Sequence, residues 1–340
     1  MSSGWEENNK EYNVCITLQY EMRKALVIGI DDYVNINSLH GCVNDACAVA
    51  EVLKRHSDGT KNFDVKQLTC TSKDSAITVK MIREDLESLF NTSVDVALFY
   101  FAGHGHTEKG NGYIVTSDSN FESGHYGLPM RDIVQIVAKS KVKNKILVFD
   151  CCFAGEVATN SYFNDVSEIP EGTTILSACT KGQYALEDEG SGVFTKLFVD
   201  ALNGSAASIV GKISPGSVYS HIDQSLGEWA QRPVFKTNIE RFVSLRDVPP
   251  RMPLSELRLL TELFLEQGSE FGLNPSFEFT DPSHIDENVS KFKILQKMEG
   301  LDLVRPVGEE HMYFAAMNNK SCKLTTLGEH YWSLVKKERI

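Results

Sequence analysis

The residues best suited to chemistry in this 340-residue chain are a histidine and a cysteine that each follow an apolar segment of strand length. His104 comes after residues 99–102 and precedes Gly105, while Cys152 comes directly after residues 146–151. Open α/β sheets place their reactive groups at the carboxyl ends of parallel strands. A thiol with an ordinary pKa of about 8.5 needs an activating base near neutral pH. The two segments therefore predict a nucleophile pair in which His104 is the base for Cys152.

The elements that would position this pair alternate between strand and helix from residue 24 onward. Uniformly apolar strands that alternate with helices indicate a mainly parallel sheet covered by helices on both faces. The predicted strands are 25–30, 65–69, 94–102, 145–150, 173–178 and 239–245, with a small outlying strand at 112–116. The predicted helices are 44–55, 75–90, 130–138, 194–202 and 217–229.

Several segments in a fixed order resemble the caspase-like cysteine peptidases, and the metacaspase branch most closely. Besides the two strand ends above, they are Arg23–Ile30, Leu39–Ala46, Thr174–Cys179 and Gly192–Thr195. In that family a strand that ends in His-Gly supplies the general base, and a strand that ends in Asp-x-Cys-x-x-Gly supplies the nucleophile about fifty residues later. The resemblance implies that Cys152, rather than its neighbour Cys151, is the nucleophile. It covers residues 23–247 and implies a catalytic dyad.

The resemblance also implies what surrounds the catalytic pair. The main-chain N–H groups of Gly105 and Cys152 would bind the oxyanion that forms when the thiolate attacks a carbonyl group. Asp45 and Asp150 would form an acidic pocket for the P1 side chain, lined also by Cys42. Carboxylates complement a guanidinium through charge-assisted hydrogen bonds, so the implied specificity is for Arg or Lys.

Two further features concern how the substrate would be held. Ala102 stands where many metacaspases have a serine, which leaves the relative preference for Arg and Lys open. Ser177, Ala178 and Cys179 are predicted to form a strand edge that pairs with an extended substrate by β-augmentation.

Simpler interpretations exist for the same residues. Cys152 alone would be a buried structural cysteine, and Asp45 could be a helix N-terminal acid stabilised by the helix dipole. Asp150 could be an ordinary carboxylate at a strand end. Cys151 is interpreted as a packed neighbour and His106 as a surface residue.

No metal or cofactor is predicted. The eight cysteines show no Cys-x-x-Cys spacing for zinc, and their scatter through apolar runs is typical of free thiols in a reducing compartment. Calcium-dependent metacaspases have an acidic pair at the start of the helix before the cysteine strand. Here Asp132 stands alone, with Asp118 as a remote second acid, so calcium dependence is not favoured. The polar first ten residues and the lack of long apolar runs predict a cytoplasmic protein with no membrane partner.

The chain changes character at Pro249, Pro250 and Pro253, because a prolyl pair continues neither a helix nor a strand. We expect an N-terminal extension at 1–22, a caspase-like peptidase domain at 23–247, a proline-rich joint at 248–253 and a second domain at 254–340. The second domain is predicted from helices at 254–266, 285–299 and 329–337 and a hairpin formed by 300–304 and 311–317. This order resembles a small winged-helix α+β domain.

Charge decides between the roles of such a domain. The whole chain has a net charge of −12, and residues 251–340 contribute −3, which makes a poor clamp for phosphates. The candidate recognition helix carries three lysines among three acids: Lys291, Lys293 and Lys297 with Asp286, Glu287 and Glu299. The composition therefore favours a protein activator or recruiter over nucleic acid.

The predicted function is a cysteine endopeptidase that cuts proteins with an exposed Arg or Lys after that residue. The resemblance implies a regulated effector of cell death or antiviral defence. Two alternatives stay open at this point: a non-catalytic scaffold with the caspase fold, and a DNA-binding regulator that acts through residues 254–340.

Overall fold

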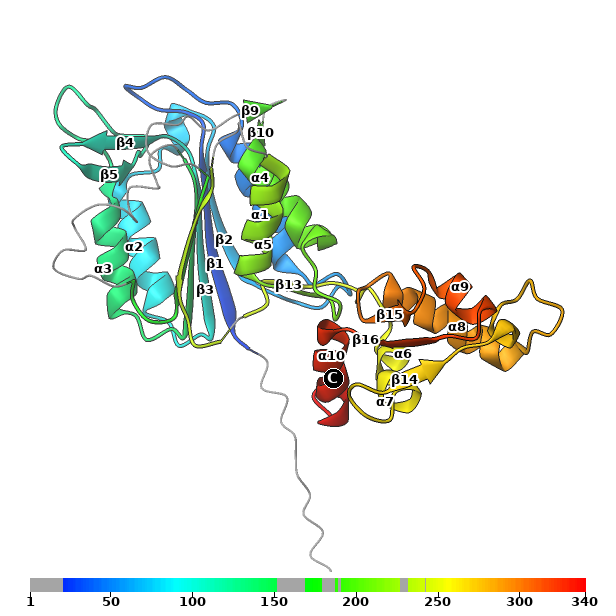
Figure 1. Ribbon diagram of the computed structural model, residues 1–340. Helices are drawn as coiled ribbons and strands as arrows, with labels where there is room; N and C mark the ends of the chain where they lie inside the picture. The colour runs from blue at the N-terminus through cyan, green and yellow to red at the C-terminus, as the bar shows by residue number, and fades with distance from the viewer. Residues whose placement is uncertain (1–20, 152–168, 179–186, 189–190, 227–231, 242) are drawn as a thin grey trace, which may run out of the picture.

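The computed structural model describes residues 21–151, 169–178, 187–188, 191–226, 232–241 and 243–340. Its centre is a six-stranded sheet in the order β12-β8-β7-β3-β1-β2, in which β12 alone runs antiparallel to its neighbour (Figure 1). The predicted α/β fold with a mainly parallel sheet is confirmed. The strands are β1 (Arg23–Ile30), β2 (Asp64–Cys70), β3 (Val96–Ala102), β7 (Asn144–Asp150), β8 (Thr173–Ser177) and β12 (Val234–Asn238).

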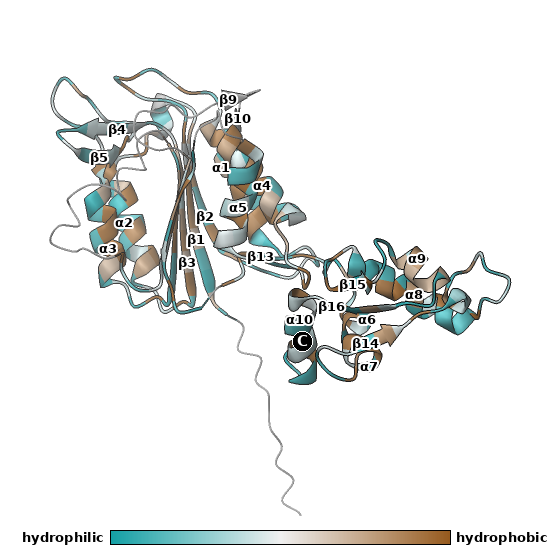
Figure 2. Ribbon diagram, viewed as in Figure 1, coloured by the Kyte–Doolittle hydropathy of each residue, from teal (hydrophilic) through white to brown (hydrophobic). Residues whose placement is uncertain are grey.

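Helices cover both faces of this sheet, as the apolar strands predict. Helices α2 and α3 lie on one face and α1, α4 and α5 on the other (Figure 1). The inner strands are hydrophobic along their length (Figure 2), and every residue of β3 is buried. Alternate residues of each strand therefore enter two separate cores. The helices are α1 (Cys42–Lys54), α2 (Val79–Phe90), α3 (Met130–Lys139), α4 (Val193–Asp200) and α5 (Pro215–Leu226).

Gly29 in β1 lets α1 lie directly on the sheet. A Cβ atom at this position would overlap the carbonyl oxygen of Cys42 and lie 2.7 Å from the Cβ of Ala46. We expect Gly29→Ala to lower the free energy of unfolding by about 1–3 kcal/mol, because α1 would have to move away from β1. Urea denaturation measures this. In Gly112→Ala the new Cβ would meet Met130 at an ordinary 3.5 Å, so an equal loss in that control would contradict the explanation.

The predicted strand at 239–245 is wrong, because the last strand of the sheet lies earlier. Val234–Asn238 forms β12, and its residues pair antiparallel with β8. Leu245 is buried and Val243 packs against the same core as α1 and α4. The apolar pattern of this segment therefore reflects burial of a connection and not strand pairing.

Short strands surround the main sheet. The predicted outlying strand at 112–116 is present as the middle strand of a three-stranded antiparallel sheet. This sheet consists of β4 (Gly105–Glu108), β5 (Asn111–Ile114) and β6 (Leu128–Pro129). Two two-stranded pairs join β9 (Glu187–Asp188) to β10 (Ser191–Gly192) and β11 (Lys212–Ile213) to β13 (Arg246–Asp247). One-turn 3-10 helices occupy Lys73–Ser75 (η1) and Pro275–Phe277 (η5), and the π-helical turn η4 spans Ala201–Ser205.

Residues from 252 onward build a third core, which also takes in Ile209 from the preceding part of the chain. The N–H group of Arg251 donates to the carbonyl oxygen of Ile209 at 3.0 Å, next to the prolyl joint. A three-stranded antiparallel sheet in the order β14-β16-β15 lies among the helices. The elements are α6 (Leu254–Arg258), α7 (Leu260–Leu263), β14 (Glu270–Gly272), α8 (Asp286–Glu299), β15 (Val304–Val307), α9 (Met312–Met317), β16 (Ser321–Leu324) and α10 (Thr326–Lys336).

Two expectations for this C-terminal part are wrong. The predicted strand at 311–317 is helix α9, whose buried residues Met312, Ala315 and Ala316 follow helical spacing. The hairpin instead joins β15 to β16 with α9 between them. The predicted helix at 254–266 is two short helices that meet at Leu259. The winged-helix resemblance itself stays a prediction.

Candidate active site

The two strands that were predicted to carry the catalytic residues are neighbours in the sheet. In the parallel pairing of β3 with β7, Ala102 lies opposite Asp150, and the N–H group of Gly103 donates to the Asp150 carbonyl oxygen at 3.3 Å. His104 and Cys152 each stand two residues beyond this pair in the sequence. Cys152 lies outside the described residues, so its role as nucleophile and oxyanion donor stays a prediction.

His104 is held in place by Tyr33. The N–H group of His104 donates to the Tyr33 hydroxyl at 2.9 Å, and the two ring centroids are 4.9 Å apart. Burial raises the pKa of Tyr33 well above its usual value, so the phenol is neutral and donates in turn to the carbonyl oxygen of Ile30. The imidazole is partly exposed at the strand end, where a base must meet its substrate.

The hydrogen bond of the His104 ring decides which nitrogen is basic. Its Nε2 lies 2.9 Å from the carbonyl oxygen of Asn37. A carbonyl oxygen only accepts, so in the neutral ring Nε2 carries the hydrogen and Nδ1 has the free lone pair. The geometry therefore makes Nδ1 the nitrogen that can take a proton from a thiol.

The glycine before His104 has no room for a side chain, and the glycine after it begins a strand. A Cβ atom at Gly103 would lie 2.8 Å from the Tyr33 hydroxyl oxygen and 2.8 Å from Phe101, so a side chain here would displace the residue that holds His104. Gly105 begins β4 and pairs with Ile114. Its main-chain N–H group as an oxyanion donor stays a prediction.

Two buried carboxylates converge on the main chain at Gly192. The Gly192 N–H group donates to Asp45 Oδ2 at 2.9 Å. A Cβ atom at Gly192 would lie 2.6 Å from Asp150 Oδ2 and 3.1 Å from Asp45 Oδ2, so those two oxygens are no further apart than these two distances combined. Asp45 is 2% exposed and Asp150 is 6% exposed. Asp45 also lies in the first turn of α1, so the helix dipole and the Gly192 N–H group both favour its charge.

Cys42 and Ala102 lie near these carboxylates. Both are buried in the core between the sheet and α1, together with Tyr100. Cys42 begins α1, and its N–H group donates to the Asp31 carboxylate at 2.9 Å. Cys151 is buried in the core on the opposite face of the sheet, which agrees with its interpretation as a packed neighbour.

The predicted substrate strand needs a correction. Ser177 is not at a sheet edge, because it pairs with Phe149 of β7 on one side and Val234 of β12 on the other. Ala178 is also buried, and its N–H group donates to the carbonyl oxygen of Phe149 at 2.9 Å. Cys179 lies outside the described residues. An extended substrate would therefore have to pair beyond Ser177.

Three residues of the site were not singled out from the sequence. Tyr33 holds His104, and Thr195 donates to Asp150 Oδ2 at 2.6 Å while its own oxygen lies 2.5 Å from the Tyr100 hydroxyl. Thr195 belongs to the Gly192–Thr195 segment, so the resemblance pointed to its neighbourhood. Tyr100 lies within the predicted strand 94–102 and Tyr33 lies outside every predicted element, and only the fold brings their hydroxyls to the site.

His106 was interpreted as a surface residue, and the structure places it only partly at the surface, with its side chain 25% exposed. Its ring stacks on those of Phe121 and Tyr126, at centroid distances of 4.3 and 4.9 Å, and these two rings are 5.8 Å from each other. Burial lowers its pKa, against the smaller opposite effect of Glu108. His106 therefore braces the short sheet that begins at Gly105.

The acids considered for calcium have other partners. Asp132 accepts a hydrogen bond from Arg83 at 2.6 Å, and Asp118 accepts one from Thr116 at 2.7 Å. Across the described parts of the chain, no group of three or more His, Cys, Asp or Glu side chains is placed to hold a metal ion. The expectation of a cofactor-independent site stays a prediction.

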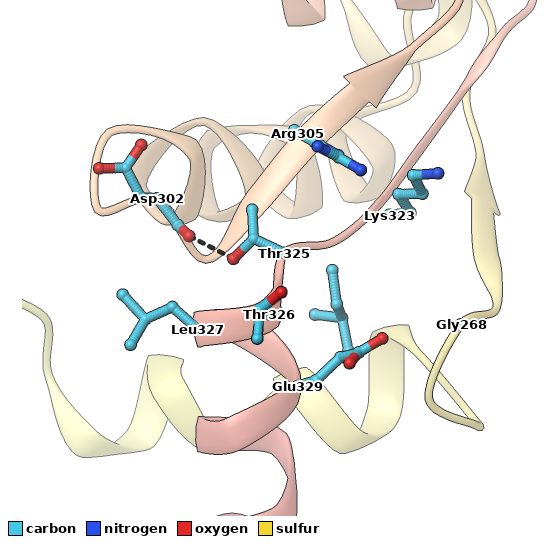
Figure 3. A pocket seen from close by; sticks show the side chains of 9 residues that line it. Gly268, Asp302, Arg305, Lys323, Thr325, Thr326, Leu327 and Glu329 are labelled. Carbon is cyan, nitrogen blue, oxygen red and sulfur yellow. Dashed lines mark hydrogen bonds between the residues drawn. The ribbon is translucent and has the colours of Figure 1, made fainter.

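A second candidate site is a pocket of about 460 Å³ in the C-terminal part, beside the start of α10. Arg305 and Lys323 lie opposite each other on β15 and β16 and extend from the sheet above the pocket (Figure 3). Asp302 and Glu329 also line it. Two cations and two acids leave the pocket without a net positive charge, unlike a site for a polyanion.

Comparisons with known proteins concern mainly the first part of the chain. Residues 22–243 match the caspase domain of the C14 peptidases. A curated paracaspase from Dictyostelium discoideum is 26% identical over 192 residues, which cover 53% of this chain and 44% of that protein. The chain thus spans less than half of that relative. A crystal structure of a protein from Geobacter sulfurreducens covers 67% of this chain and 98% of its own, with 14% identity and a TM-score of 0.48. Among the described helices, none has the length and apolar character needed to cross a membrane.

Proposed function

The chain belongs to the caspase-domain family, and from this premise we propose that it is a cysteine endopeptidase that cleaves protein substrates after Arg or Lys. The convergence of Asp45 and Asp150 on Gly192 is the observation that carries the proposal. Two buried carboxylates at the carboxyl end of the sheet suit a guanidinium or ammonium group, which would relieve their mutual repulsion. The same arrangement would repel an acidic P1 side chain.

In the proposed mechanism His104 Nδ1 takes the proton from the Cys152 thiol, and the thiolate attacks the carbonyl carbon of the P1 residue. The main-chain N–H groups of Gly105 and Cys152 bind the oxyanion. As the C–N bond breaks, the proton on His104 passes to the leaving amine and a thioester remains. Water then attacks the thioester, with His104 as its base, and releases the acid and the free thiol.

Matched fluorogenic peptides that differ only at P1 test this proposal. We expect the wild-type chain to hydrolyse peptides that end in Arg or Lys and not the peptide that ends in Asp, and Cys152→Ala to hydrolyse none of them. Cleavage after Asp would contradict the acidic pocket. Activity that survives in Cys152→Ala would contradict the nucleophile. No hydrolysis of any of these peptides by the wild-type chain would favour the scaffold alternative.

We propose further that residues 254–340 bind a protein activator or recruiter, and that the peptidase is a regulated effector of cell death or defence. Two of the three lysines of α8 are engaged in ion pairs, Lys291 with Glu287 at 2.7 Å and Lys297 with Glu256 at 2.8 Å. Lysines that are already paired with carboxylates would neutralise few DNA phosphates and so release few of the counterions bound to DNA, which supports a protein partner over DNA. Tight, salt-dependent binding of the full chain to duplex DNA in a filter assay would instead favour the DNA-binding regulator.

A further inference from the structure

Two hydroxyl groups behind Asp150 form a chain of hydrogen bonds with a defined direction. Thr195 Oγ1 donates to Asp150 Oδ2 at 2.6 Å, and the Tyr100 hydroxyl oxygen lies 2.5 Å from the same Oγ1. A hydroxyl group has a single hydrogen. Because Thr195 gives its hydrogen to the carboxylate, Tyr100 must be the donor to Thr195. The chain therefore runs from Tyr100 through Thr195 to Asp150.

This chain is closed off from water. Tyr100 is fully buried and Thr195 is 1% exposed. In such surroundings hydrogen bonds are stronger than in water, and each bond in a chain polarises the next. Burial raises the pKa of Tyr100 well above its usual value, and the charges of Asp150 and Asp45 raise it further. The phenol therefore keeps its proton and donates at neutral pH.

The acidic pocket needs such a donor. Two carboxylates close to each other in a buried site raise each other's pKa, while a hydrogen bond to the ionised form lowers it. Asp45 accepts a hydrogen bond from the N–H group of Gly192, and Asp150 accepts one from the hydroxyl group of Thr195. Each carboxylate thus has a donor of its own that favours the charged form.

We propose that Thr195 and Tyr100 are positioning residues of the acidic pocket: their hydroxyl chain orients Asp150 and keeps it ionised, and so determines how tightly and down to what pH a cationic P1 side chain is bound. This inference rests on the proposed function and deepens it. Neither residue would touch the substrate, since both act through the Asp150 carboxylate.

The test compares Thr195→Val, which keeps the shape and removes the hydroxyl, with Thr195→Ser, which keeps the hydroxyl. We expect Thr195→Val to raise KM for peptides with P1 Arg by roughly tenfold to a hundredfold, the scale for losing a hydrogen bond to a charged group. Without the Thr195 hydroxyl the ionised form of Asp150 is less stabilised, so we expect activity to be lost at a higher pH as the solution is acidified. Thr195→Ser should stay close to wild type in both respects. Tyr100→Phe should shift both in the direction of Thr195→Val, by less.

Thr174→Val is the matched control, because Thr174 is a buried threonine of β8 that bonds to Thr237 instead. A wild-type KM and pH profile in Thr195→Val would overturn the proposal, as would equal damage in Thr195→Ser. The same variants are also made in the Cys152→Ala background, where no hydrolysis can occur. Calorimetry of an Arg-ended peptide binding to them then tests the hydroxyl chain separately from catalysis. If Thr195→Val weakens this binding but the wild type hydrolyses no peptide, the role of the hydroxyl chain is supported and the peptidase function is contradicted. Binding that ignores the P1 residue would overturn both.

Discussion

Replacing His104 by alanine is expected to lower kcat for P1 Arg peptides by about 10²–10⁴-fold, the range for removing a general base. The reason is that Nδ1 of His104 is the nitrogen left free by the hydrogen bond from Nε2 to Asn37. KM should change little, because the imidazole does not take part in binding the P1 side chain. Steady-state kinetics with the Arg peptide measure both constants, and thermal unfolding checks that the variant is folded.

The rate of Cys152 alkylation by iodoacetamide gives a second readout for His104 that needs no peptide substrate. In His104→Ala the pH at which this rate rises should move toward about 8.5, the ordinary thiol value. His330→Ala removes an exposed histidine of α10 and is the matched control. Unchanged kcat and an unchanged alkylation profile in His104→Ala would show that His104 is not the base.

Asp150→Asn is expected to lower kcat/KM for P1 Arg peptides by about 10²-fold, since a buried charge partner is lost while the shape is kept. The amide oxygen can still accept the hydrogen bond of Thr195, so the fold should change little. Peptides with an uncharged P1 residue should be affected far less, which is the sign of a specificity residue. The measurement is the ratio of kcat/KM for P1 Arg to that for P1 norleucine.

The control for Asp150→Asn is Asp85→Asn, a partly buried acid of α2 that pairs with Lys66 far from the site. Its ratio should equal that of the wild type. An equal fall for charged and uncharged P1 residues in Asp150→Asn would mean that this carboxylate supports the fold and does not select the substrate.

The sheet of this protein was predictable because its strands are apolar runs of the right length between helices of clear periodicity. Val96–Ala102 and Asn144–Asp150 were expected within two residues, and their neighbouring position in the sheet follows from the parallel α/β pattern. The segment 239–245 was wrongly predicted as a strand, because a buried connection can be as apolar as a strand. The segment 311–317 was wrongly predicted as a strand: its aromatic residues Tyr313 and Phe314 favour strands, but the buried residues Met312, Ala315 and Ala316 have helical spacing.

From the sequence, only those residues of the site that belong to a recognisable motif could be predicted. His104, Asp45 and Asp150 belong to recognisable segments, and the structure places the two acids at one glycine. Tyr33 and Tyr100 could not be found in this way, because each acts through a hydroxyl whose partner is about 70 or 95 residues away in the sequence. Ser177 was misjudged as an edge residue for a related reason: the strand that covers it, β12, had been expected several residues later.

Covalent labelling tests the central claim most directly, that Cys152 attacks the carbonyl of a residue whose cationic side chain lies between two carboxylates. The wild-type chain would be treated with peptidyl acyloxymethyl ketones that end in Arg or in Asp, and the modified residue located by mass spectrometry of the digested protein. We predict one label, on Cys152, from the Arg reagent, and none from the Asp reagent or in His104→Ala. The exposed thiol of Cys47 is the internal control for unspecific alkylation. Equal labelling by both reagents, or labelling of Cys47 in place of Cys152, would contradict the account.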